Sequence, residues 1–165
     1  MDALTPAELV TDRLRLEPLR VDHAPEMVEV LADQALYGFT GGEPPSLTDL
    51  ERRYTGQAAG SGDPAEQWLN WIVRLTATGQ ALGYVQATVE PEHTEVAWTI
   101  GAPWQGNGYA REATVAMADW LRSAHHAPLL AWIHPDHVAS HRVAQAIGLA
   151  LTDEVDDDGE HAWRE

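Results

Sequence analysis

The stretch APWQGNGYAREA, at 102–113, most constrains how this chain folds. It follows an apolar stretch, EVAWTI at 95–100, that predicts a strand, and it leads into apolar residues at helical spacing, which predict a helix. Gly106 and Gly108 lie where that helix starts. A strand that enters a helix through glycines places free backbone N–H groups at the positive end of the helix dipole. Such a turn predicts a phosphate-binding site, because glycine lets a phosphate approach the backbone closely.

Two common phosphate-binding loops do not fit these residues. A P-loop needs a lysine, and all ten cationic side chains of this chain are arginine. A dinucleotide-binding Rossmann loop needs a third glycine or alanine where Arg111 stands, and it comes early in a series of βαβ units. A dinucleotide-dependent oxidoreductase is therefore only a distant alternative.

The hydrophobic pattern predicts four helices and seven strands. Alternating leucines in RLRLEPL, at 13–19, predict a half-buried strand. Two helices follow, the first capped by Asp22 and the second by Ser46. The remaining strands are predicted at 68–76, 81–89, 95–100, 128–133, 149–155 and 161–165, the last two as a terminal hairpin.

The two later helices have clear apolar faces. One is predicted up to residue 124, with apolar residues recurring from 113 onward, and the other at 137–148. In the second, Val138, Val143 and Ile147 are expected to face inward and Gly148 to end the helix. The order β-α-α-β-β-β-α-β-α-β-β predicts an α/β fold, in which helices flank both faces of a twisted, mostly antiparallel mixed sheet. A chain of 165 residues fits a single domain over residues 1–165.

Composition excludes several classes of protein. The chain has no cysteine, which excludes disulfides, thiolate catalysis and cysteine zinc sites. The acidic N-terminus has no apolar segment of the kind found in signal peptides, and no stretch approaches the ~20 apolar residues of a membrane helix. We therefore expect a cytoplasmic protein that does not bind membranes.

The formal net charge is −16 at pH 7. Such a field repels nucleic acid, so we expect no nucleic-acid partner. Two interpretations of the charge remain open. It attracts a cationic substrate, or it is a solubilising surface typical of a halophilic or high-GC source.

Three blocks of the sequence resemble the GNAT acetyltransferases in order and spacing. They are TDRLRLEPL at 11–19, EVAWTIGAPWQGNGYAREA at 95–113 and HPDHVASHRVAQAIGLAL at 134–151. Within the second block, Gln105, Gly108 and Ala110 match the family's Q/R-x-x-G-x-G/A motif. The detail most resembles the RimJ/RimL-like branch, which acetylates protein N-termini, and its small-molecule relatives.

The resemblance covers most of the chain and implies a fold and an activity. The fold is the GNAT-type acyl-CoA N-acyltransferase fold. The activity is N-acetyltransfer from acetyl-CoA to a primary amine, on a protein N-terminus or a small molecule, by direct transfer in a ternary complex. A homodimer is common in this branch.

The resemblance also implies which residues bind acetyl-CoA. Its diphosphate would lie in the loop of Gln105, Gly106, Asn107, Gly108, Tyr109, Ala110 and Arg111. Its pantetheine arm would pair with Trp98, Thr99 and Ile100, where this strand parts from its neighbour. Asn107 stands where the family often has a cation, and only Arg111 and Arg142 are near in the sequence. We therefore expect backbone N–H groups to provide much of the affinity.

Glu95 is the candidate general base, acting directly or through a water, like the glutamate that many GNAT enzymes carry on this strand. A base is needed because a lysine amine has a pKa of ~10.4, whereas an α-amine, at ~7.7–8.0, is already partly neutral. The alternative is that Glu95 is only an exposed carboxylate at the end of a strand.

Ser140 is the candidate group near the departing sulfur, since the RimJ/RimL-like branch has a serine there. The alternative is a serine that only satisfies N–H groups of its own helix. The tyrosine that many family members use as the acid is replaced by Ala144, and His137 stands where asparagine is common. These departures leave a second hypothesis open, an acyl-CoA-binding module that has lost catalysis.

Tyr37 and Phe39, in the loop before the second helix, are the acceptor-binding candidates, because that region lines the amine side in the family. His137 and His141 are spaced like zinc ligands on a helix, but without a convincing third ligand we predict no metal. The tryptophans are expected to pack in the core and against the sheet rather than to form a ligand cage.

Overall fold

The computed structural model describes residues 2–165. Its strands are β1 (Leu9–Val10), β2 (Leu14–Pro18), β3 (Gln67–Leu75), β4 (Ala81–Val89), β5 (Thr94–Ile100), β6 (Leu129–Ile133), β7 (Ala150–Val155) and β8 (His161–Arg164). Its α-helices are α1 (Ala24–Val30), α2 (Leu47–Ala59), α3 (Tyr109–Ala124) and α4 (Val138–Ala146). Each predicted strand and helix is present in the predicted order, and the short β1 is additional.

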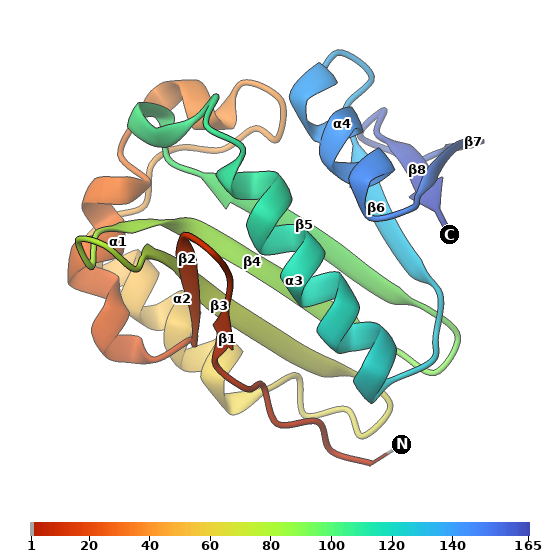
Figure 1. The fold of residues 1–165 in the computed structure, drawn as a ribbon, viewed down its shortest axis with the longest axis horizontal. Coiled ribbons are helices and arrows are strands. Elements are labelled where there is room, and N and C mark those ends of the chain that lie inside the picture. The colour runs from red at the N-terminus through yellow and green to blue at the C-terminus, as the bar shows by residue number, and fades with distance from the viewer. Residues whose placement is uncertain (1) are drawn as a thin grey trace.

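The strands form one sheet in the order β1-β2-β3-β4-β5-β6-β8-β7 (Figure 1). Neighbouring strands are antiparallel except β5 and β6, which are parallel. Parallel neighbours need a long crossover, and α3 provides it. The fold prediction of a mostly antiparallel mixed sheet is confirmed.

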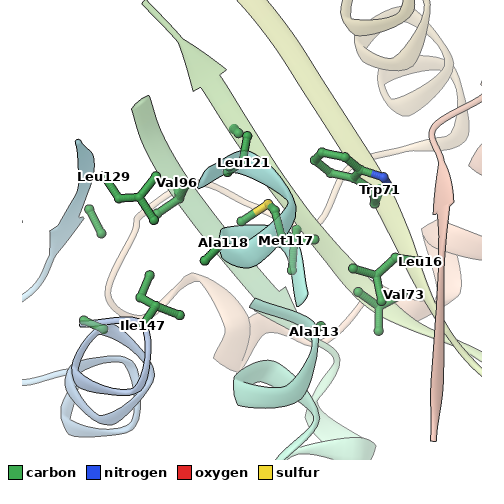
Figure 2. Packing of buried hydrophobic residues seen from close by; sticks show 14 of the residues in the cluster. Leu16, Trp71, Val73, Val96, Ala113, Met117, Ala118, Leu121, Leu129 and Ile147 are labelled. Carbon is green, nitrogen blue, oxygen red and sulfur yellow. The ribbon is translucent and has the colours of Figure 1, made fainter. Parts of the chain in front are cut away.

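Two hydrophobic cores hold helices against opposite faces of the sheet. In the larger one, α3 buries Met117 against a sheet surface that includes Trp71 and Val96 (Figure 2). In the smaller one, α1 and α2 pack on the other face, where Leu50 and Ile72 are fully buried. Side chains alternate between the two faces along a strand. The neighbours of Val96 in β5 therefore face the side of α1 and α2.

Two details of the sequence prediction are wrong. Asp22 does not cap α1, because it lies inside a 3₁₀ turn that runs directly into the helix, and His23 occupies the N-cap position. Val138 is 55% exposed instead of facing inward, whereas Val143 and Ile147 are buried as predicted. Val138 is five residues before Val143, which places it about 140° away around the helix.

The second helix begins as the sequence predicts. The Ser46 hydroxyl accepts a hydrogen bond from the Asp49 N–H at 3.1 Å, and α2 follows immediately. Among residues 2–165, no helix is both long enough and apolar enough to cross a membrane.

Candidate functional site

The glycine-containing loop presents unpartnered backbone donors. Gly106 and Gly108 have φ values of +80° and +82°, in the left-handed region that favours glycine. Within the described residues, no side chain caps α3 and the N–H groups of residues 108–111 donate no hydrogen bond. The dipole of this 16-residue helix adds positive potential at the same point. The loop therefore has the donors and the potential of an anion-binding site.

Two polar side chains of the loop donate hydrogen bonds to nearby backbone carbonyls. Gln105 Nε2 donates to the Ile100 carbonyl at 2.8 Å, and Asn107 Nδ2 donates to the Trp104 carbonyl at 2.9 Å. These two side chains fix the shape of the loop, and the unpartnered N–H groups of residues 108–111 remain available to bind a ligand.

A cation that was not predicted from the sequence, Arg13, lies at this loop. The Arg13 guanidinium donates to the Asn107 carbonyl at 2.9 Å and lies 4.5 Å from the centre of the Tyr109 ring. Arg13 and Asn107 are 94 positions apart, so only the fold brings them together. Arg111 and Arg142, the cations considered from the sequence, are exposed. The available signal was the resemblance of residues 11–19 to the family, which had not been connected to the loop.

Strands β5 and β6 are paired over a short length. Within the described residues, the pairing is limited to Thr94 with Leu129 and Glu95 with Leu130. Beyond these pairs the two strands diverge (Figure 1). The predicted parting of β5 from its neighbour is thus present in the structure.

The direction of the hydrogen bonds shows which groups border the gap between the two strands. The Thr94 N–H donates to the Pro128 carbonyl, toward β6, and the Gly101 N–H donates to the Leu82 carbonyl, toward β4. Backbone groups alternate between the two sides of a strand. The Trp98 N–H therefore points toward β6, in the part of β5 that β6 does not pair.

Side chains connect β5 to the start of α4, the helix that follows β6. Trp98 Nε1 donates to Ser140 Oγ at 3.2 Å, and His137 Nε2 lies 3.3 Å from the same oxygen. Ser140 is only 7% exposed. Phe39 stacks on the His137 ring, with centroids 4.5 Å apart and planes 13° apart. The structure thus brings Trp98, Ser140 and Phe39 together through His137, to which the sequence had assigned no role in the site.

Glu95 lies at the point where β5 and β6 part, on the face of the sheet opposite α3. The residue is exposed by area, but the surrounding protein removes part of the hydration of its carboxylate. This burial raises the pKa of Glu95, as do the nearby Glu90 and Asp156 carboxylates, while His93 lowers it. A carboxylate with a raised pKa is a stronger base than an ordinary one.

The two aromatic acceptor candidates lie in different environments. The Tyr37 hydroxyl donates to the Leu31 carbonyl at 2.8 Å, and burial raises its pKa. Tyr37 thereby ties the 3₁₀ turn Gln34–Tyr37 to the end of α1. Phe39, which follows this turn, is 42% exposed and stacks on the His137 ring.

Sequence reasoning also missed polar residues on the sheet face that carries Glu95. Thr88 pairs with Glu95, and Asn70 pairs with Gln86 on the neighbouring strands. Asn70, Gln86 and Thr88 are all half-buried. The available signal was two polar residues at alternate positions of β4, Gln86 and Thr88, and the polar Asn70 inside β3.

Other features of the described residues do not add to the site. No group of three or more His, Asp or Glu side chains among residues 2–165 is arranged to hold a metal ion. Two shallow hollows lie beside the end of α2 and beside the β3–β4 turn. Neither includes a residue predicted for the site.

The chain matches a family model described as acetyltransferase (GNAT) domain over residues 13–150. A search of curated proteins found no significant match.

Many solved structures share the fold. An acetyltransferase from Agrobacterium tumefaciens is 25% identical, with a TM-score of 0.76 over 100% of this chain and 97% of that one. A GNAT acetyltransferase from Bacillus anthracis is 16% identical, with a TM-score of 0.78 over 96% and 98%. RimL, a ribosomal alpha-N-protein acetyltransferase solved with coenzyme A, is 15% identical, with a TM-score of 0.79 over 96% and 95%.

Proposed function

Because the chain belongs to the GNAT acetyltransferase family, it transfers an acetyl group from acetyl-CoA to an amine, and we propose that the loop before α3, Glu95 and Ser140 perform this reaction. The observation that carries the proposal is the set of unpartnered N–H groups at residues 108–111, next to the unpaired part of β5. These are the donors that a diphosphate and a pantetheine amide need.

Acetyl-CoA supplies an activated acetyl group as a thioester. The N–H groups of the loop hold the diphosphate, as residues 105–111 were predicted to do. Trp98, Thr99 and Ile100 line the unpaired part of β5, where the pantetheine arm pairs. The Trp98 N–H, pointing toward β6, also polarises the thioester carbonyl in the manner of an oxyanion hole.

Glu95 accepts a proton from the protonated amine, directly or through a water, which leaves the nitrogen neutral and able to attack the thioester carbon. Its position supports this role, since it lies where the strands part and on the face opposite α3. The raised pKa adds to its strength as a base. The bond from carbon to sulfur then breaks, and CoA leaves as the thiolate, which takes up a proton from solvent.

The Ser140 hydroxyl donates a hydrogen bond to the departing sulfur and stabilises the thiolate. Trp98 Nε1 can only donate, so it occupies a lone pair of Ser140 Oγ. Burial lowers the pKa of His137, helped by His141 and His134, so the imidazole is neutral near pH 7. When its one hydrogen is on Nε2, His137 also donates to Ser140, and the serine hydroxyl is free for the sulfur.

The Ser140→Ala variant is expected to lower kcat by about 10-fold to 100-fold, the effect of one hydrogen bond to a charged group. The KM for acetyl-CoA should stay near its original value. Release of the free thiol, followed with a thiol reagent, measures both constants. Ser123→Ala is the matched control, because the Ser123 hydroxyl donates only to a carbonyl of its own helix.

His137→Ala should reduce kcat in the same direction but by less. If His137 acts through Ser140, the two losses will not add in the double variant. Additive losses, or a Ser140→Ala enzyme with full kcat, would contradict these roles.

The acceptor is an amine that enters from the face carrying Glu95, next to Phe39 and Tyr37. A cationic acceptor fits the net charge of −16. The raised pKa of Glu160, caused by burial and by nearby Asp156 and Asp158, marks a concentration of negative charge close to Glu95. An α-amine suits this site best, since it needs less help to lose its proton than a lysine does.

Thermal unfolding with acetyl-CoA, CoA, NAD and ATP in parallel tests the donor. A ligand at 100 times its Kd adds ~2.7 kcal/mol, which raises Tm by about 5–10 °C in a domain of this size. We expect this rise with acetyl-CoA and CoA only. No rise with either would overturn the assignment of the loop. CoA binding without turnover on a broad panel of amines would instead support the non-catalytic module.

A further inference from the structure

Arg13 connects three parts of the loop region at once. Its Nε donates to Glu112 Oε1 at 2.8 Å, and its backbone N–H donates to the other carboxylate oxygen at 3.1 Å. Its Nη1 donates to the Asn107 carbonyl at 2.9 Å, and its guanidinium lies over the Tyr109 ring. The segment between β1 and β2 is thereby attached to the first turn of α3.

The bond to Asn107 determines where a neighbouring donor points. In a trans peptide, the carbonyl of one residue and the N–H of the next point in opposite directions. Because Arg13 holds the Asn107 carbonyl, the Gly108 N–H is directed away from Arg13. That N–H is the first of the unpartnered donors at the start of α3.

Arg13 also cancels a charge that would oppose anion binding. Glu112 lies in the first turn of α3, close to the donors of the loop. Burial alone would raise the pKa of Glu112, but hydrogen bonds from Thr11 and Arg13 hold it below its ordinary value. The carboxylate is therefore ionised at neutral pH, and without Arg13 it would repel a diphosphate.

We propose that Arg13 is the positioning residue of the diphosphate loop, which it holds in its anion-binding shape while it neutralises Glu112. The proposal rests on the assignment of the loop to acetyl-CoA. Arg13 provides the loop with a cation, which the family often has at the position of Asn107. The guanidinium acts from outside the loop, through the Asn107 carbonyl.

Comparing two acetyl donors tests this role. Arg13→Gln should raise the KM for acetyl-CoA about 10-fold, a loss typical of one charge-assisted contact, with kcat nearly unchanged. It should leave kcat/KM for S-acetyl-pantetheine unchanged, because this donor has no diphosphate. A merely structural role would impair both donors equally.

The Arg13→Lys variant separates the effect of the positive charge from that of the guanidinium geometry. Lysine keeps the charge but lacks the planar guanidinium that binds Glu112 and Asn107 together. The KM of Arg13→Lys for acetyl-CoA should therefore lie between the values of the wild type and of Arg13→Gln. The matched control is Arg122→Gln, which removes an arginine near the other end of α3 that pairs with Glu165 at 2.8 Å. The control should keep the KM for acetyl-CoA.

Each outcome has one meaning. An unchanged KM for acetyl-CoA in Arg13→Gln, or equal losses with both donors, overturns the role of Arg13. A wild-type protein that neither binds CoA nor uses acetyl-CoA overturns the proposed function instead. Because exposed ion pairs contribute only about 0–1 kcal/mol to stability, the variants should remain folded, and their melting curves check this.

Discussion

Glu95→Gln is expected to lower kcat by about 10²-fold to 10⁴-fold at neutral pH, because the amide cannot accept the proton of the amine. The KM for acetyl-CoA should change little, since Glu95 does not belong to the loop. Steady-state kinetics with a primary amine, recorded between pH 6 and 10, would measure the loss.

The pH dependence gives this experiment a second readout. The difference in kcat between the wild type and Glu95→Gln should narrow as pH rises past the pKa of the acceptor amine, because the amine then binds already neutral. Glu92→Gln is the matched control, since Glu92 is an exposed residue of the turn before β5. A Glu95→Gln enzyme as active as this control would show that Glu95 is only an exposed carboxylate at the end of a strand.

Glu17→Gln is expected to destabilise the protein by about 3 kcal/mol, or about 6–12 °C in Tm. Glu17 is buried in β2, where it accepts hydrogen bonds from Arg74 at 2.9 Å and from Arg15 at 2.9 Å and lies 3.1 Å from His23 Nε2. The amide has no charge with which to offset the guanidinium of Arg74. Glu26→Gln is the control on the same arginine and should cost less, since Glu26 is 40% exposed in its side chain.

The stability contributed by Glu17 has a defined pH dependence. Burial would raise its pKa, but hydrogen bonds from Arg74 and His23 and the charge of Arg74 lower it from 4.5 to about 2. A lowered pKa stabilises the folded state above the unfolded value, and this contribution is lost as pH falls. Between pH 4.5 and about 2, Tm should therefore fall more steeply in the wild type than in Glu17→Gln. Parallel curves, or a Tm unchanged by the substitution, would contradict this account.

The sequence was most informative where local rules determine structure. Gly106 and Gly108 lie directly before α3, as predicted, and both have a positive φ. The Ser46 cap formed as its pattern predicted. In both cases residues close in the sequence account for most of the local conformation.

The sequence was least informative where distant segments meet. Nothing in the local pattern near residue 13 indicates that its guanidinium reaches a carbonyl 94 positions away. The stack of Phe39 on His137 likewise depends on how the loop before α2 crosses to α4. The exposure of Val138 is a different case, because the helical period itself places this residue about 140° from Val143.

The parting of β5 and β6 has a consequence for how the protein responds to its substrate. Beyond Thr94 and Glu95, the edge of β5 that faces β6 has no strand partner within the described residues. An extended pantetheine arm that pairs with this edge would serve as a partial strand. Binding of the donor would then also extend the pairing of the sheet. Strands β6 to β8 and α4 would be held more firmly to the rest of the molecule when acetyl-CoA is bound.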